Sequence, residues 1–257
     1  SFNRDIDFKA TTVNLLSATA IELAQAYRAR TLSPVEATKA ILEAIPDFDS
    51  LNAFCHLNPE LALSAARASE QRYNEGAPLS GLDGVPIGIK DLLVTKGMPT
   101  RRGSLTTSAE DPCDADAPAV ARLREAGAVI LGKTVTTEFA YFAPGPTRNP
   151  YNPAHTPGGS SSGSAAAVGA GLVPLAFGTQ TIGSINRPAA FCGAVGYKPS
   201  YDRIPKTGVL PLSPSLDHVG LFAKTAVSAQ TAAQLMVNYW QPTTPSPTLT
   251  VGVPEGC

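Results

Sequence analysis

The 257-residue sequence has few cysteines and histidines and no excess of charge of either sign. Its four cysteines, Cys55, Cys113, Cys192 and Cys257, lie far apart and form no CxxC spacing, and the three histidines form no cluster with them. This pattern argues against a small disulfide scaffold and predicts no metal site. Twenty basic and twenty-one acidic residues give a net charge of −1 without a long basic run. Neither nucleic acid nor an anionic membrane surface is therefore an expected partner.

The sequence also lacks long apolar runs. No uninterrupted apolar stretch reaches the length of a membrane-spanning helix, and no basic segment followed by an apolar one opens the chain. We therefore expect a soluble, cytoplasmic protein with free thiols and no signal peptide. The hydrophobic content of 43% is ordinary for a globular protein of one large α/β domain or two small ones.

Helical patterns occupy the first part of the chain, and short apolar segments alternate with helices after Gly81. We expect a helix capped by Ser17, a second opened by the capping box at 33–36, and a third from Pro59 towards Gly76. Further along, strands are expected at 85–89, 128–131 and 175–179, and helices at 117–127 and 164–171. This alternation predicts a layered α/β fold.

The composition changes again near the end of the chain. Residues 241–247 are rich in proline and threonine, and 249–253 have the pattern of another strand. We expect one domain over 1–257, with N-terminal helices at 1–78, a core at 79–240, and a linker with the start of a further strand at 241–257. A strand pattern in this place indicates the N-terminal portion of a longer protein.

Two short motifs match other enzyme classes. Residues 127–134, GAVILGKT, fit the phosphate-loop pattern, but their apolar centre favours a buried strand that ends in a glycine turn. Residues 159–163, GSSSG, fit the G-x-S-x-G turn of α/β-hydrolases, with Ser161 as the nucleophile and His218 downstream. A proline-rich loop precedes this motif where a hydrolase has a strand. An esterase using Ser161 and His218 is kept as an alternative.

The most informative stretch is 158–193, where two glycine-rich turns carry Ser160 and Ser184. Upstream, Lys90 follows an apolar segment. Each residue has a purely structural alternative: Ser160, Ser161 and Ser162 as helix caps, Ser184 as a turn residue, and Lys90 as a solvated side chain. Considered together, they indicate nucleophilic chemistry, because a serine hydroxyl needs a neighbour to accept its proton and a desolvated lysine can do so.

Several motifs occur in a fixed order along the chain: GVPIGIKD at 84–91, GKT at 132–134, EFA at 138–140, NPYNP at 149–153, PGGSSSGS at 157–164, the segment 178–190, FCG at 191–193 and GYKP at 196–199. This ordered set, over about residues 12–257, resembles the amidase signature family. The resemblance implies a mixed central β-sheet layered between α-helices. It also implies hydrolysis of a carboxamide or related C–N bond through an acyl-enzyme, with no metal or organic cofactor.

The resemblance further implies a Ser–cisSer–Lys triad. Ser184 matches the nucleophile, Ser160 matches the bridging serine, whose preceding peptide bond is cis in the family, and Lys90 matches the terminal base. Ser161 and Ser162 are then expected to be caps or loop supports. The oxyanion hole would consist of four backbone N–H groups, those of Thr181, Ile182, Gly183 and Ser184.

The chain departs from the family around its expected nucleophile. Many members have DTGGSIR where this chain has QTIGSIN at 180–186, followed by Arg187 one position later than the family arginine. These changes favour a stand-alone amidase over the glutaminase subunit of tRNA-dependent amidotransferases. Ile182 fits the turn only with a negative φ.

The expected substrate is a small-molecule amide, bound beside Tyr141 and Phe142. Because family members extend beyond this length, the remaining C-terminal portion of the same protein is an expected partner, and a second copy in a homodimer is another. A non-catalytic subunit with the amidase fold is the alternative from a different functional class.

Overall fold

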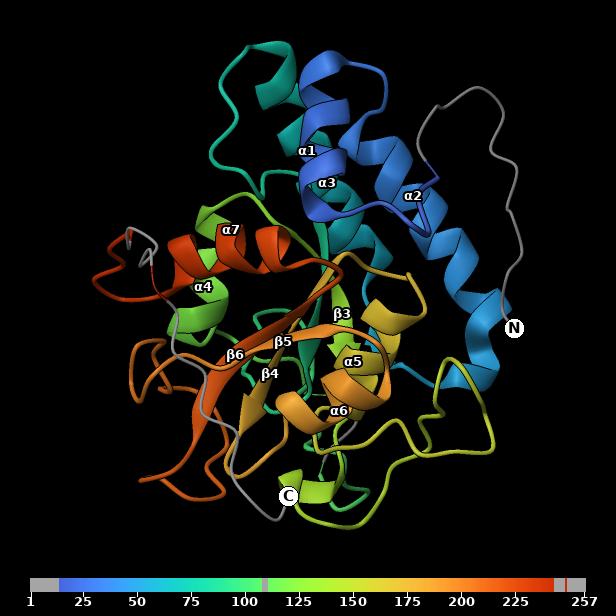
Figure 1. Ribbon diagram of the computed structural model, residues 1–257. Helices are drawn as coiled ribbons and strands as arrows, with labels where there is room; N and C mark the ends of the chain where they lie inside the picture. The colour runs from blue at the N-terminus through green and yellow to red at the C-terminus, as the bar shows by residue number, and fades with distance from the viewer. Residues whose placement is uncertain (1–13, 108–110, 243–247, 249–257) are drawn as a thin grey trace.

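The computed structural model describes residues 14–107, 111–242 and 248. Within them, strands form one mixed sheet of order β1-β3-β2-β4-β6-β5 (Figure 1). The strands are β1 (Phe54–Leu57), β2 (Pro86–Lys90), β3 (Val129–Thr134), β4 (Leu175–Gln180), β5 (Val195–Tyr197) and β6 (His218–Ala223). Strand β2 is parallel to both β3 and β4, whereas the other pairs are antiparallel.

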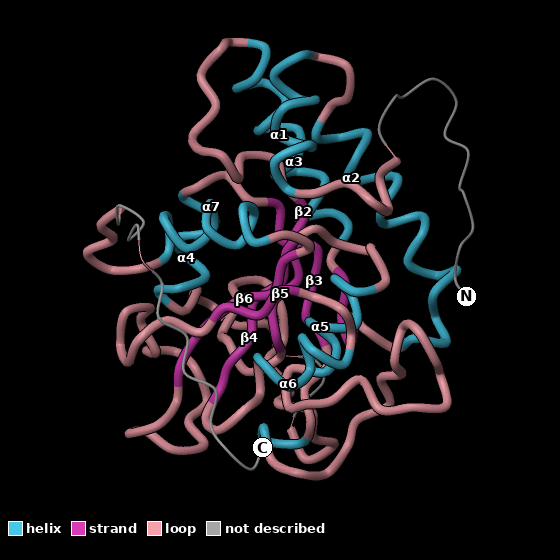
Figure 2. Tube along the Cα trace, in the orientation of Figure 1, coloured by secondary structure: helices cyan, strands magenta, loops and turns pink. Residues whose placement is uncertain are grey.

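Helices cover both faces of this sheet, as the sequence predicted. They are α1 (Ala20–Ala29), α2 (Pro34–Ala44), α3 (Pro59–Asn74), α4 (Pro118–Glu125), α5 (Ser162–Gly169), α6 (Asn186–Phe191) and α7 (Ala226–Met236), with 3-10 turns η1 (Ile45–Leu51) and η2 (Glu138–Ala140). Figure 2 shows α4 and α7 on one side of the strands and α5 and α6 on the other. The fold is therefore a mixed β-sheet layered between α-helices.

The sheet holds its layers together through alternating side chains. On β4, Leu175 and Phe177 join the apolar cluster that contains Val120 of α4 and Met236 of α7. The intervening Ala176 joins a second cluster with the alanines of α5. Every residue of β2, β3 and β4 is buried, so these strands read as continuous apolar runs rather than as alternating patterns.

The capping box at Ser33 is confirmed, but the cap predicted at Ser17 is wrong. Thr19 caps α1: its hydroxyl accepts the Glu22 N–H, and the Glu22 carboxylate accepts the Thr19 N–H. Ser17 instead donates its hydroxyl to the carbonyl of Asn14, 3.1 Å away. A capping box needs an acid or amide three residues after the cap, and the residue three positions after Ser17 is an alanine.

Strand β3 runs further than predicted, and the glycine turn expected at its end is absent. Gly132, Lys133 and Thr134 all belong to the strand and pair with β1 and β2. Gly132 lies against the carbonyl group of His56, where a Cβ atom would collide. The glycine therefore permits close approach of β1 and opens no phosphate-binding loop.

The parallel pairing of β2 with β4 sets the position of the candidate site. Ile89 pairs with Phe177, so the carboxyl ends of both strands, with Lys90 and the residues after Phe177, lie at the same edge of the sheet. No helix in the described part of the chain is long and apolar enough to cross a membrane. The strand expected at 249–253 lies outside the described residues, and the division of the domain at residues 78 and 240 stays a prediction.

Candidate active site

Lys90 ends β2, and its side chain is fully buried, with 0% exposure. Its Nζ lies 2.8 Å from Ser160 Oγ and 2.8 Å from Thr179 Oγ1. Burial lowers the pKa of Lys90 well below its ordinary value, and the negative charge of Asp217 offsets part of this effect. The amine is therefore poised in its neutral form, which can accept a proton.

Ser160 lies in the turn before α5 and is also buried. The peptide bond between Gly159 and Ser160 is cis, as the family resemblance implies. The carbonyl of Ser160 accepts the Thr137 N–H at 3.0 Å. The carbonyl of Gly159 accepts two hydrogen bonds from Arg187, from Nε at 3.1 Å and from Nη2 at 2.6 Å. This peptide is thus held on both sides.

Ser184 lies in the turn between β4 and α6 and is 9% exposed. Its carbonyl accepts the N–H of Ser161 at 3.4 Å, which joins this turn to the turn of Ser160. Its hydroxyl makes no hydrogen bond to a described residue, so the structure connects Lys90 to Ser160 but not Ser160 to Ser184. Ile182 is absent from the non-glycine residues with positive φ, so it fits the turn as expected.

The backbone of the Ser184 turn presents unused donors. Among the residues that the structure describes, the N–H groups of Ile182, Gly183 and Ser184 have no hydrogen-bond acceptor. The next two N–H groups, of Ile185 and Asn186, both donate to Gln180 Oε1, at 2.8 and 2.9 Å. Converging free N–H groups suit a carbonyl oxygen that gains negative charge.

Gln180 was recognised from the sequence only as a departure from the family pattern. Its carboxamide oxygen satisfies the two N–H groups that open α6, which have no partner within the helix. An amide and an acid both offer an oxygen, so the replacement at position 180 keeps an acceptor for the turn without a negative charge. The sequence carried no spacing signal for this contact.

Sequence reasoning also missed Thr179 and Asp217. Thr179 reaches Lys90 because of the register between β2 and β4, which the sequence does not reveal. The Asp217 carboxylate accepts the Thr181 hydroxyl, and it accepts the N–H groups of Leu212 and Ser213 at 2.8 and 2.9 Å. It therefore anchors the loop before β6 to the turn of Ser184.

The structure does not bring Ser161 and His218 together. Ser161 is fully buried, donates its hydroxyl to the Thr179 carbonyl at 3.1 Å and accepts the Thr179 N–H at 3.3 Å. His218 Nδ1 lies 2.7 Å from the carbonyl of Leu216. Although Ser161 occupies the cap position of α5, its side chain makes no capping bond there. It supports the loop, as does Ser162, whose hydroxyl donates to the Val135 carbonyl.

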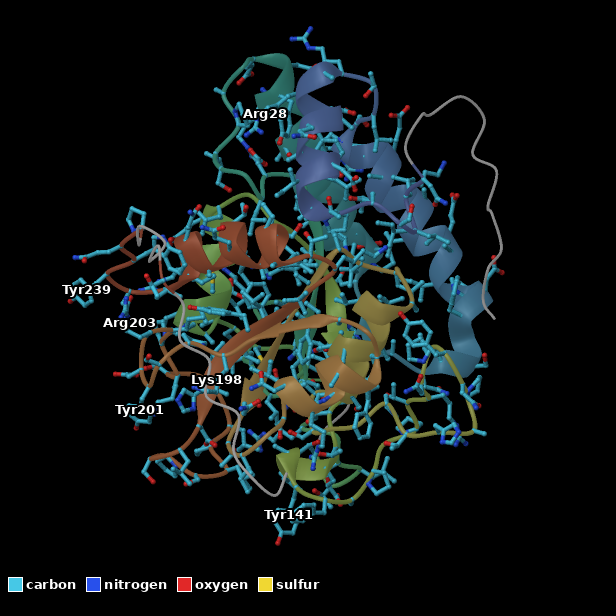
Figure 3. All side chains as sticks on the ribbon, viewed as in Figure 1. Arg28, Tyr141, Lys198, Tyr201, Arg203 and Tyr239 are labelled. Carbon is cyan, nitrogen blue, oxygen red and sulfur yellow. The ribbon has the colours of Figure 1, made fainter. Side chains whose placement is uncertain are left out.

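A cavity of about 560 Å³ lies beside the serine turns. Its lining includes Tyr141 and Phe142, the residues predicted for a pocket, together with Gly159 and Arg187. The rings of Tyr141 and Phe142 pack edge to face with centroids 4.7 Å apart, and both are well exposed. Figure 3 places Tyr141 at the end of the molecule opposite Arg28 of α1.

Comparison with known proteins gives consistent matches. The family model described as Amidase matches residues 36–255. A subunit of glutamyl-tRNA(Gln) amidotransferase from Acidothermus cellulolyticus is 46% identical over 223 residues, which are 84% of this chain and 44% of the relative. The protein of the same name from Methylococcus capsulatus is 45% identical, over 86% of this chain and 47% of the relative. The chain thus spans about half the length of these curated relatives.

Solved structures match over most of the chain. The peptide amidase from Stenotrophomonas maltophilia has a TM-score of 0.82 and 36% identity, over 86% of this chain and 48% of that one. A bacterial aryl acylamidase of the amidase signature family has a TM-score of 0.77 and 28% identity, over the same shares. The fold and the order of motifs therefore agree with these structures.

Proposed function

The chain belongs to the amidase family, and on this basis we propose that it supplies the serine, relay and base of an enzyme that hydrolyses a carboxamide or related C–N bond. The observation that carries the proposal is the 2.8 Å contact between the fully buried amine of Lys90 and the hydroxyl of Ser160. A dry amine beside a serine is the pairing that activates a hydroxyl nucleophile without histidine.

In the proposed cycle, Ser184 Oγ attacks the amide carbonyl carbon while its proton passes to Ser160 Oγ and the proton of Ser160 passes to Lys90 Nζ. The tetrahedral oxyanion is held by backbone N–H groups of residues 181–184. The proton then returns through Ser160 to the leaving nitrogen, the C–N bond breaks, and an ester on Ser184 remains. Water, activated by the same relay, hydrolyses this ester and restores the free serine.

The free N–H groups of the Ser184 turn support the oxyanion assignment. Loss of one such donor typically raises an activation barrier by about 3–4 kcal/mol. Asp217 also fits this scheme, because it holds the side chain of Thr181 and thereby the start of the turn.

The finer substrate class is a small-molecule amide, and we propose Tyr141 and Phe142 as part of its pocket because they line the cavity next to Gly159. The names of the relatives include a peptide amidase, an aryl acylamidase and one component of a glutamyl-tRNA(Gln) amidotransferase. The departures at Gln180, Ile182 and Asn186 favour a stand-alone enzyme.

A second candidate is an amidase-fold component that works within a complex. The 46% identity to one component of an amidotransferase favours it. It predicts that the intact protein alone releases no ammonia and gains activity with a partner. A homodimer, a partnership with the C-terminal portion of the same protein, and a cytoplasmic location stay predictions.

The test uses the intact natural protein and a panel of aliphatic, aryl and peptide amides, with ammonia or amine release as the readout. The wild type should turn over at least one amide, and Ser184→Ala should abolish this while the protein still unfolds cooperatively. Retained turnover by Ser184→Ala would overturn the proposal. Under the esterase alternative, Ser161→Ala and His218→Ala would be the inactivating changes instead.

A further inference from the structure

Arg187 contacts both serine turns at once. It stands in the first turn of α6, and its backbone N–H donates to the Gly183 carbonyl at 2.9 Å. Its guanidinium donates twice to the Gly159 carbonyl, at 3.1 and 2.6 Å. Gly183 immediately precedes Ser184, and Gly159 immediately precedes Ser160. A single residue therefore ties the carbonyl before one serine to the carbonyl before the other.

We propose that Arg187 is a positioning residue that sets the separation of Ser160 and Ser184. The inference rests on the proposed function, because it concerns the relay between those two serines. It differs from that proposal in assigning a role to a side chain outside the triad, the oxyanion turn and the expected pocket residues.

The Gly159 carbonyl depends on Arg187 for its hydrogen bonds. Among the described residues, no other donor contacts this oxygen. The segment before Ser160 consists of Gly158 and Gly159, which have no side chains to anchor it. A hydrogen bond from a charged guanidinium is about twice as strong as one between neutral groups. The arginine thus replaces the side-chain packing that these glycines lack.

Position 187 matters for the direction of the side chain. The family pattern has its arginine one position earlier, where this chain has Asn186. One step along a helix turns a side chain by about 100° around the axis. Here Asn186 is exposed and its side chain bonds to no described residue, whereas Arg187 reaches across to Gly159. The shift of the arginine is therefore what places a guanidinium on the peptide that leads into Ser160.

The expected consequence is a loss of reactivity without a loss of substrate binding. Without the guanidinium, the Gly159 carbonyl can rotate and carry Ser160 Oγ away from its place between Lys90 and Ser184. A displacement of about 1 Å in such a constellation costs on the order of 100-fold in rate. Arg187→Ala should therefore lower kcat, and leave KM for an uncharged amide unchanged.

The test measures how fast Ser184 of the intact natural protein reacts with an uncharged alkyl fluorophosphonate, followed by intact mass. We expect Arg187→Ala to slow labelling by about 10- to 100-fold. Added guanidinium ion below its denaturing range should restore much of the rate, and Arg187→Lys should be intermediate because an ammonium lacks the fork. Arg148→Ala is the matched control, since Arg148 is exposed and lines the same cavity. It should label at the wild-type rate.

Labelling of Arg187→Ala at the wild-type rate would overturn the inference and leave the proposed function standing. A slower rate that follows loss of cooperative unfolding and is not restored by guanidinium would overturn it too. A KM increase confined to anionic amides would assign Arg187 to substrate binding instead. If the wild type itself is not labelled, the proposed function fails, and the inference with it.

Discussion

Lys90 should make the stability of this protein depend on pH. Its amine is fully buried, and burial lowers its pKa well below the ordinary value. In the unfolded chain the same lysine titrates near about 10.4. Between these two pKa values the unfolded state binds more protons than the folded state, so the free energy of unfolding rises with pH across that window. The cost of keeping Lys90 buried is greatest below the folded pKa and vanishes above about pH 10.4.

Lys90→Met isolates this effect, because methionine is also unbranched but does not titrate. One proton is worth about 1.4 kcal/mol per pH unit inside the window. The variant also loses the contacts to Ser160 and Thr179, each 2.8 Å, and their hydroxyls stay buried. A lost partner of this kind costs about 1–3 kcal/mol, independent of pH. The offset between the two proteins is therefore a mixture, but its slope with pH belongs to Lys90.

The assay is urea unfolding of wild type and Lys90→Met at a series of pH values below about 10.4. Wild type should gain stability over the variant by about 1.4 kcal/mol per pH unit within the window. Lys39→Met is the control, because Lys39 lies exposed on α2 and its loss should leave the slope unchanged. Buried Lys133 is present in all three proteins, so its titration cancels. Parallel pH dependence of wild type and Lys90→Met would refute the reasoning, since it would mean that Lys90 stays charged in the fold.

Three further predictions concern the same site. Asp217→Asn removes a charge that raises the pKa of Lys90, so the rise of amidase activity with pH should move to lower pH; an unmoved profile in a stably folded variant would contradict this. Gln180→Met leaves two N–H groups without an acceptor and should lower the free energy of unfolding by about 1–3 kcal/mol for each, as measured in urea. Lys90→Ala should reduce amide turnover far more than Ser161→Ala, because only the lysine accepts the proton; equal losses would argue against Lys90 as the base.

Local signals in the sequence predicted local structure well. The capping box at Ser33 and the proline start of α3 at Pro59 act within a single helical turn, so the sequence alone reveals them. Apolar runs located the central strands. The extension of β3 through Thr134 was missed, because it depends on pairing with β1, which is distant along the chain.

The contacts of the site divide in the same way. Lys90, Ser160 and Ser184 were named from the order of motifs, and the structure places Lys90 against Ser160. Thr179 and Arg187 could not be named, because their contacts depend on strand register and on the approach of two turns separated by a helix and a strand. Hydrogen bonds between such segments leave no spacing pattern in the sequence.

The central claim is that Ser184 is the nucleophile. The most direct measurement is peptide mapping of the fluorophosphonate adduct on the intact natural protein. The account predicts one adduct, on the Oγ atom of Ser184, and no adduct in Lys90→Met. An adduct on Ser160 or Ser161, or an unlabelled wild-type protein, would contradict it.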